Sequence, residues 1–101
     1  MPRYLIERNV PGAHHMSPEE LHRAANVSCD ALDELAPDVQ WQQSYITEDK
    51  ITCVYVARDE GGVREHARIS GFPADTIREI VEEIGPGTAE PRQPAAKGAS
   101  A

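Results

Sequence analysis

The chain has 101 residues, with 17 acidic against 10 basic side chains and a formal net charge of −7. An acidic surface favours cationic ligands and argues against nucleic acid or an anionic membrane as partner. No apolar stretch approaches the ~18 residues of a membrane span, and the N-terminus lacks the apolar core of a secretion signal. We therefore expect a cytoplasmic protein.

The length suits one domain, which we place at residues 1–86. Residues 87–101 are rich in Pro, Ala and Gly and contain no large apolar side chain, a composition typical of a disordered tail. A domain of this size buries only ~60–65 % of its unfolded surface, so dimerisation would help to stabilise it. The two cysteines, Cys29 and Cys53, form no disulfide framework, and we expect both to be free, buried thiols.

The first half of the chain predicts a strand followed by a helix. Residues 3–10 ("RYLIERNV") carry the apolar side chains of a short strand and end at a Pro-Gly pair, as strands do. Ser17 then offers an N-cap, Pro18 a first helical residue and Glu20 the carboxylate of a capping box. The helix runs to Ala36 and presents one apolar stripe, made of Leu21, Ala25, Ser28, Leu32 and Leu35.

The second half predicts a hairpin, a second helix and a last strand. Residues 39–47 and 50–57 alternate or run apolar around a tight turn. Asp59 can cap a helix over residues 60–70, and Gly71 ends it. Residues 75–84 fit a helical period as well, but we predict a strand because the sheet needs a closing member. The inward face of the second helix would carry Val63, His66, Ala67 and Ser70.

The order strand–helix–strand–strand–helix–strand predicts an α+β, ferredoxin-like fold with an antiparallel sheet and both helices on one face. In the strand 50–57, Ile51, Cys53, Tyr55 and Ala57 point one way, while Thr52, Val54 and Val56 point the other. Both faces of the sheet are therefore largely apolar. A second subunit would cover the face without helices, which predicts a homodimer.

Several segments resemble one family of small proteins, otherwise of unknown function, of which one branch is nickel-binding and dimeric. They are "MPRYLIERNVPG", "SPEEL", "SCDAL", "VQWQQSYITEDKITCVYVA", "REHAR" and "GFPA". The resemblance runs from Met1 to about Glu90. It implies a ferredoxin-like dimer that binds nickel at its surface for sequestration or detoxification. The resemblance does not assign individual ligand residues.

Nickel(II) favours imidazole nitrogens together with carboxylate or water oxygens, so histidines are the candidate ligands. His14 and His15 are adjacent on a loop and could reach one ion. His22 lies on the first full turn of the first helix, one turn from Glu19 and Asn26, either of which could share an ion with it. The alternative is that all three histidines are solvated residues beside a capping box.

His66 is our first candidate for a functional metal ligand, since it lies within the resembling segment "REHAR" on the helix face that should meet the sheet. A buried imidazole must be hydrogen-bonded or act as a ligand, and Tyr45, Tyr55 and Cys53 are the nearest expected partners. A satisfied core histidine remains the alternative. Cys53 could be a soft ligand or nucleophile, but a mid-strand cysteine is usually an inert small apolar residue.

Two enzyme hypotheses compete with metal binding. Removal of Met1 would leave the secondary amine of Pro2, as in tautomerases that use an N-terminal proline as general base. A dimeric αβ barrel oxygenase or lyase would instead use His66, Tyr45 and Glu7 in a cleft between helices and sheet. By strand parity Trp41 and Tyr45 should share one face, as core or dimer contacts.

Overall fold

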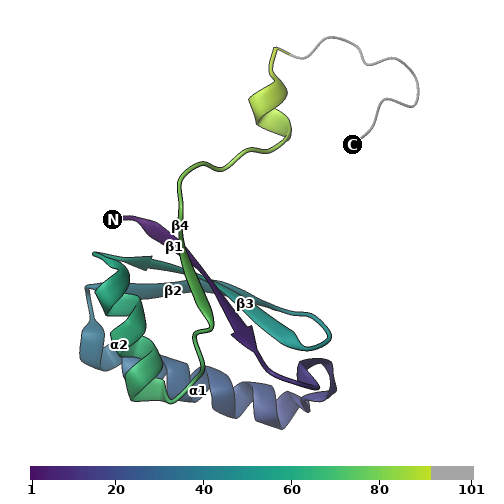
Figure 1. Ribbon diagram of the computed structural model, residues 1–101, viewed down its shortest axis with the longest axis vertical. Helices are drawn as coiled ribbons and strands as arrows, with labels where there is room; N and C mark the ends of the chain where they lie inside the picture. The colour runs from purple at the N-terminus through teal and green to yellow at the C-terminus, as the bar shows by residue number, and fades with distance from the viewer. Residues whose placement is uncertain (92–101) are drawn as a thin grey trace.

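The computed structural model describes residues 1–91, which form a four-stranded antiparallel sheet with two helices packed on one face (Figure 1). The elements are β1 (Arg3–Asn9), η1 (Ala13–His15), α1 (Pro18–Leu35), β2 (Val39–Ile46), β3 (Lys50–Ala57), α2 (Glu60–Ser70), β4 (Thr76–Ile80) and η2 (Pro86–Ala89). The strand order across the sheet is β2-β3-β1-β4, and every neighbouring pair is antiparallel. The predicted ferredoxin-like arrangement is confirmed.

Both helices begin at a side-chain cap, and α2 ends at a glycine. The Ser17 hydroxyl accepts a hydrogen bond from the Glu20 N–H, and the Glu20 carboxylate accepts one from the Ser17 N–H, both at 3.1 Å. This reciprocal pair is the predicted capping box of α1. The Asp59 carboxylate caps α2 by accepting from the Gly62 N–H at 3.1 Å. Gly71 ends α2 with φ of 79°, a left-handed conformation that favours glycine.

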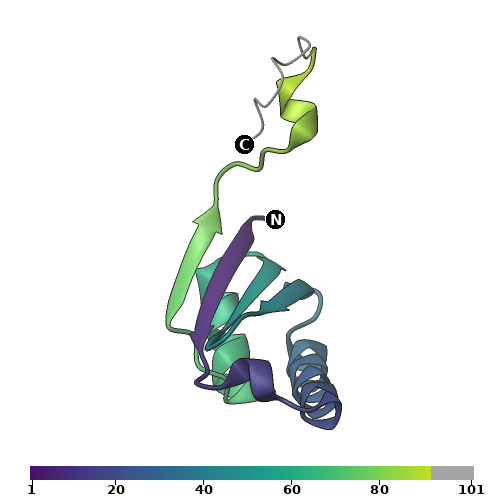
Figure 2. The same ribbon diagram turned by 90° about the vertical axis from the view of Figure 1, so that its right-hand side faces the viewer.

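The last strand is shorter than the predicted strand over residues 75–84. β4 covers Thr76–Ile80 and pairs with β1, with Ile77 opposite Ile6. Beyond β4, Val81 and Ile84 are 85 % and 76 % exposed, because the chain leaves the sheet (Figure 2). The pairing with β1 makes this segment a strand, although its apolar residues also fit a helical period.

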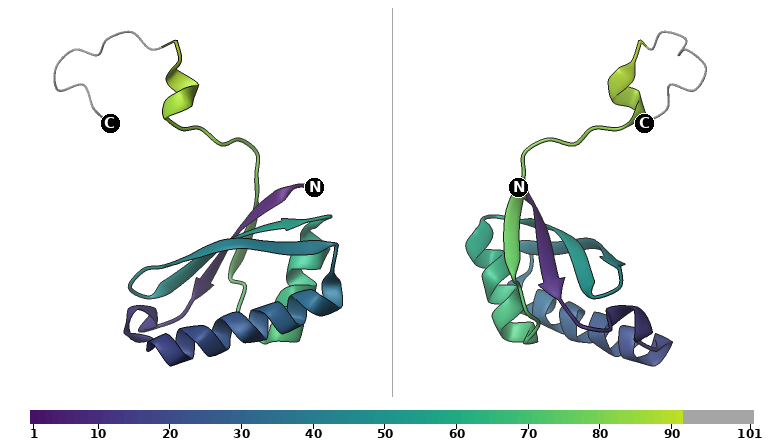
Figure 3. Two further views of the ribbon diagram at one scale, coloured as in Figure 1. Left: turned by 180° about the vertical axis from the view of Figure 1, so that it is seen from behind. Right: turned by 45° about the vertical axis from the view of Figure 1, so that its right-hand side comes forward.

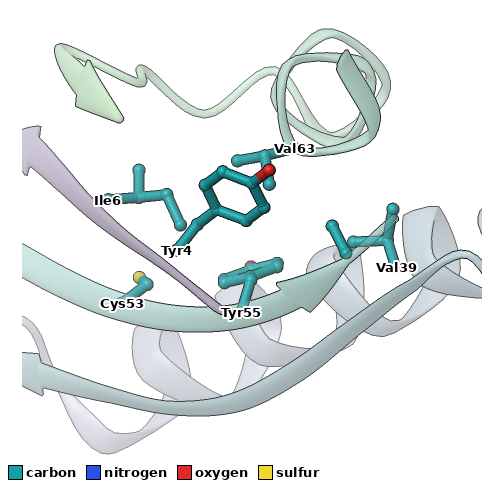
Figure 4. Packing of buried hydrophobic residues seen from close by; sticks show 7 residues of the cluster. Tyr4, Ile6, Val39, Cys53, Tyr55 and Val63 are labelled. Atoms are coloured by element: carbon teal, nitrogen blue, oxygen red, sulfur yellow. The ribbon is translucent and has the colours of Figure 1, made fainter. Parts of the chain in front are cut away.

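The core lies between the sheet and the helices, as the strand parity predicts. Val63 of α2 packs against side chains from β1, β2 and β3 (Figure 4). Cys29 contradicts the expectation of two buried thiols: Ser28 and Ala31 carry the buried side of α1, and Cys29 is exposed, whereas Cys53 is buried. The buried apolar cluster consists of Tyr4, Ile6, Val39, Cys53, Tyr55, Ala57 and Val63.

The opposite face of the sheet carries no helix of the described chain (Figure 3). Its centre is apolar, since Leu5 lies opposite Val54 in the β1–β3 pair. Val54 is only 5 % exposed in a single chain. Of the predicted tail at residues 87–101, positions 92–101 lie outside the described residues. No helix within residues 1–91 is long and apolar enough to cross a membrane.

Candidate functional site

A buried polar network joins both helices to the sheet. His66 of α2 is fully buried, and its Nε2 lies 3.1 Å from the Ser28 hydroxyl of α1 and 3.4 Å from the Tyr55 hydroxyl of β3. The two hydroxyls are themselves 3.2 Å apart. The expectation that His66 faces the sheet and meets Tyr55 is therefore confirmed, and Ser28 is a third member that sequence reasoning placed only in an apolar stripe.

Burial keeps this network neutral. Loss of solvent, and next the nearby charge of Arg8, lower the pKa of His66 from 6.5 to about 4. Burial likewise raises the pKa of the Tyr55 hydroxyl above 10.0. The Nδ1 atom of His66 has no hydrogen-bond partner among the described residues. At neutral pH the network thus holds an uncharged imidazole between two hydroxyl groups.

Arg8 is a buried cation that sequence reasoning missed. It lies in β1, is 3 % exposed, and donates a hydrogen bond from Nη1 to the Pro73 carbonyl at 2.6 Å. Its Nη2 has no partner, and within residues 1–91 no carboxylate lies at ion-pair distance from it. The guanidinium carbon is 5.9 Å from the ring centres of both Tyr55 and Phe72. Strand alternation could have revealed it, since Tyr4, Ile6 and Arg8 share one face of β1.

A cavity of about 440 Å³ opens between the N-terminal half of α1 and the sheet. Arg8 and Tyr55 belong to its wall, so the cavity borders the polar network. Most of the remaining wall is apolar. The lining residues are Arg8, Val10, Met16, Leu21, Ala24, Ala25, Ser28, Trp41, Ser44, Ile46, Ile51, Cys53, Tyr55, Phe72 and Pro73.

The loop histidines form a close pair at the surface. His14 and His15 lie in η1, both exposed, with ring centres 3.9 Å apart. The Nδ1 atom of His14 is 2.6 Å from the Glu48 carbonyl oxygen. Because a carbonyl oxygen only accepts, this Nδ1 carries the hydrogen, and Nε2 of the neutral ring keeps a free lone pair.

The four histidines predicted as metal ligands do not gather at one site. His22 is exposed on α1, and His66 is enclosed by Ser28 and Tyr55. Residues 1–91 contain no group of three or more His, Cys, Asp or Glu side chains placed to hold a metal ion. The structure brings together only the pair in η1. Cys53 is engaged elsewhere, since its sulfur accepts a hydrogen bond from the Ser44 hydroxyl at 3.0 Å.

The residues of the barrel-enzyme hypothesis lie on opposite faces of the sheet. Glu7 of β1 and Tyr45 of β2 both lie directly opposite Thr52 of β3. Residues opposite each other share a face, so Glu7 and Tyr45 lie on the face away from His66. The expectation that Tyr45 shares a face with Trp41 is wrong, because a bulge between Trp41 and Gln43 shifts the alternation by one residue. His66, Tyr45 and Glu7 therefore cannot act together in one cleft of a single chain.

Comparison with known proteins identifies the family. A model of the family described as nickel responsive protein SCO4226-like matches residues 4–80. The chain belongs to the SCO4226-like family. Its fold is similar to the crystal structure of SCO4226 from Streptomyces coelicolor A3(2), with a TM-score of 0.67 and 20 % identity, over 81 % of this chain and 99 % of that chain. No curated protein matches the sequence. The resemblance seen in the sequence is thus confirmed for the family and the fold.

Proposed function

We propose that this protein is a cytoplasmic nickel(II)-binding protein that sequesters the metal, and that His14 and His15 are its principal ligands. The observation that carries the proposal is the hydrogen bond from His14 Nδ1 to the Glu48 carbonyl oxygen. Metal-ligating histidines commonly donate their other ring N–H to a carbonyl, which fixes the tautomer and orients the ring. The nickel-responsive name of the family supports the choice of metal.

The donor set fits nickel chemistry. Two neutral imidazoles are ligands that nickel(II) accepts, and water molecules can fill the remaining positions of an octahedral or square-planar ion. His22, exposed on α1 one turn after Glu19, is an accessory surface ligand in this proposal. The burial and hydrogen bonds of His66 support its role as a core histidine, which was the alternative left open above.

Calorimetric titration of the tag-free protein with nickel, zinc, cobalt and magnesium tests this assignment. We expect nickel binding that the double variant His14→Ala/His15→Ala weakens by more than the roughly 10–100-fold that loss of an outer-shell partner costs. His22→Ala is the matched control, because it removes an exposed histidine outside η1. Nickel binding that survives in the double variant would refute the pair as ligands. No binding by the unaltered protein would refute the function.

We further propose that the protein is a homodimer through the open face of the sheet. Leu5 supports this, because it is apolar and partly exposed on the face that no described helix covers. In sedimentation velocity we expect a dimer that Leu5→Glu converts into a monomer. Asn26→Glu adds the same charge on exposed α1 and should leave the dimer intact. If both variants sediment as dimers, the interface lies elsewhere.

A further inference from the structure

The cavity between α1 and the sheet combines an apolar wall with one buried cation. Its volume of about 440 Å³ lies within the ~300–1,000 Å³ range of small-molecule sites. Arg8 is one of the residues that line the cavity, together with Phe72 and Pro73. Neither the nickel-binding proposal nor the core network uses this arrangement.

We propose that the cavity binds an organic monocarboxylate, with its apolar body between α1 and the sheet and its carboxylate on Arg8. The site is separate from the histidine pair in η1. It would bind this ligand without transforming it.

The buried charge of Arg8 would be stabilised by an anion. A guanidinium cannot lose its proton in a protein, and a buried charge is costly unless it is paired. The neighbours of Arg8 stabilise the cation in part but include no anion: the Pro73 carbonyl accepts from Nη1, the rings of Tyr55 and Phe72 lie at cation–π distance, and Nη2 has no partner. A carboxylate can accept from the unused N–H groups of the planar guanidinium fork.

The other polar groups near Arg8 do not supply this anion. Burial raises the pKa of Tyr55 and lowers the pKa of His66. At neutral pH Tyr55 is therefore protonated and His66 is uncharged. The hydroxyls of Ser28 and Tyr55 are satisfied by each other and by His66. A ligand carboxylate is therefore the group that completes the wall.

The rest of the wall selects an apolar body. Leu21 and Ala25 of α1 face Trp41, Ile46 and other apolar side chains of the sheet across the cavity. Such walls accept either a hydrocarbon chain or an aromatic ring, and burial of apolar surface would drive binding of both. The shared chemistry is a single carboxylate on an apolar body, and the experiment separates the two sources.

Trp41 provides a direct reading of the cavity, because it lines the wall and is the single tryptophan of the chain. We would titrate the full chain with decanoate, phenylbutanoate and decanol, following Trp41 fluorescence and confirming each affinity by calorimetry. We expect saturable binding of one or both acids, at least about tenfold tighter than decanol, since a hydrogen bond to a charged group contributes about that factor. Binding of decanoate alone identifies a hydrocarbon ligand, and binding of phenylbutanoate alone an aromatic one.

Two variants with matched controls locate the site. Arg8→Met should lower affinity for the acid about tenfold or more and leave affinity for decanol unchanged, whereas Arg78→Met, which removes an exposed arginine of β4, should change neither. Ala25→Phe should fill the cavity and abolish binding, while Asn26→Phe on the exposed side of α1 should not. Far-UV circular dichroism verifies that each variant is folded, and Ala25→Phe keeps the test decisive if Arg8→Met does not fold.

Several results would overturn the proposal. They are the absence of saturable binding of either acid, equal affinities for decanol and decanoate, and unchanged acid binding in Ala25→Phe or in a folded Arg8→Met. The His14→Ala/His15→Ala variant should bind the acid as the unaltered protein does. Loss of nickel binding and loss of acid binding are thus separate outcomes.

Discussion

His66 should make the stability of the fold sensitive to mild acid. Its pKa of about 4 in the folded protein lies below the ordinary value of 6.5, because the buried imidazole resists protonation. In the unfolded chain the imidazole takes up a proton as pH falls through 6.5. The unfolded state therefore binds more protons between pH 6.5 and about 4, and the free energy of unfolding must decrease over this window.

The size of this effect follows from the two pKa values. Their separation corresponds to a total loss of about 3 kcal/mol in the free energy of unfolding once the pH is below both values. Lowering pH from about 7 to about 5 should remove about 2 kcal/mol of that amount. The pKa values of Glu20 and Glu65 lie below the ordinary 4.5, so their stabilising contributions are lost only in stronger acid.

Urea unfolding at pH 7 and pH 5 measures the effect, with His66→Gln as the test variant. Glutamine can place an amide group near the Ser28 and Tyr55 hydroxyls and does not titrate, so most of the loss on acidification should vanish in this variant. His22→Gln, at an exposed position, should lose stability as the unaltered protein does. If His66→Gln loses as much between the two pH values as the unaltered protein, the reasoning about His66 is refuted.

Three further substitutions test local features of the fold by urea unfolding. Ser17→Ala removes one half of the capping box and should cost about 1 kcal/mol; no change would mean that the box does not stabilise α1. An added Cβ meets nothing within 4 Å at Gly71 or at Gly85, so the two positions differ only in backbone conformation. Gly71→Ala should cost about 1 kcal/mol because its φ is 79°, and Gly85→Ala should cost nothing because its φ is not positive. Gly62→Ala places a Cβ 2.9 Å from Cγ2 of the buried Val39 and should cost about 1–3 kcal/mol; a variant as stable as the unaltered protein would refute this clash.

The elements with local signals were predictable from the sequence. Ser17 and Glu20 stand at the spacing of a capping box, and Gly71 stands where a helix needs a left-handed residue, so the start of α1 and the end of α2 follow from short-range chemistry. Residues 75–84 have no such local signal. Their helical periodicity is overruled by pairing with β1, a long-range interaction that only the topology of the whole domain suggests.

The face of each side chain was predictable only where the alternation is regular. His66 follows from the stripe of α2, and Tyr55 follows from the parity of β3. Tyr45 does not, because the bulge in β2 reverses the parity after Trp41, and no sequence signal marks it. Ser28 meets His66 across 38 positions of the chain, so its role depends on the packing of α1 against α2.

The anchoring of η1 gives a last prediction about the histidine pair. The Asp49 carboxylate accepts a hydrogen bond from the Gly12 N–H at 2.9 Å, at the start of the turn that carries His14 and His15. Asp49→Ala should loosen this turn, so that nickel must order both imidazoles on binding, and affinity should fall several-fold although no ligand is changed. Glu48→Ala removes the same charge but keeps the backbone carbonyl that holds His14, and should leave affinity unchanged. Equal losses in both variants, measured by calorimetry, would show that the negative charge of this loop, and not the ordering of the ligands, controls nickel binding.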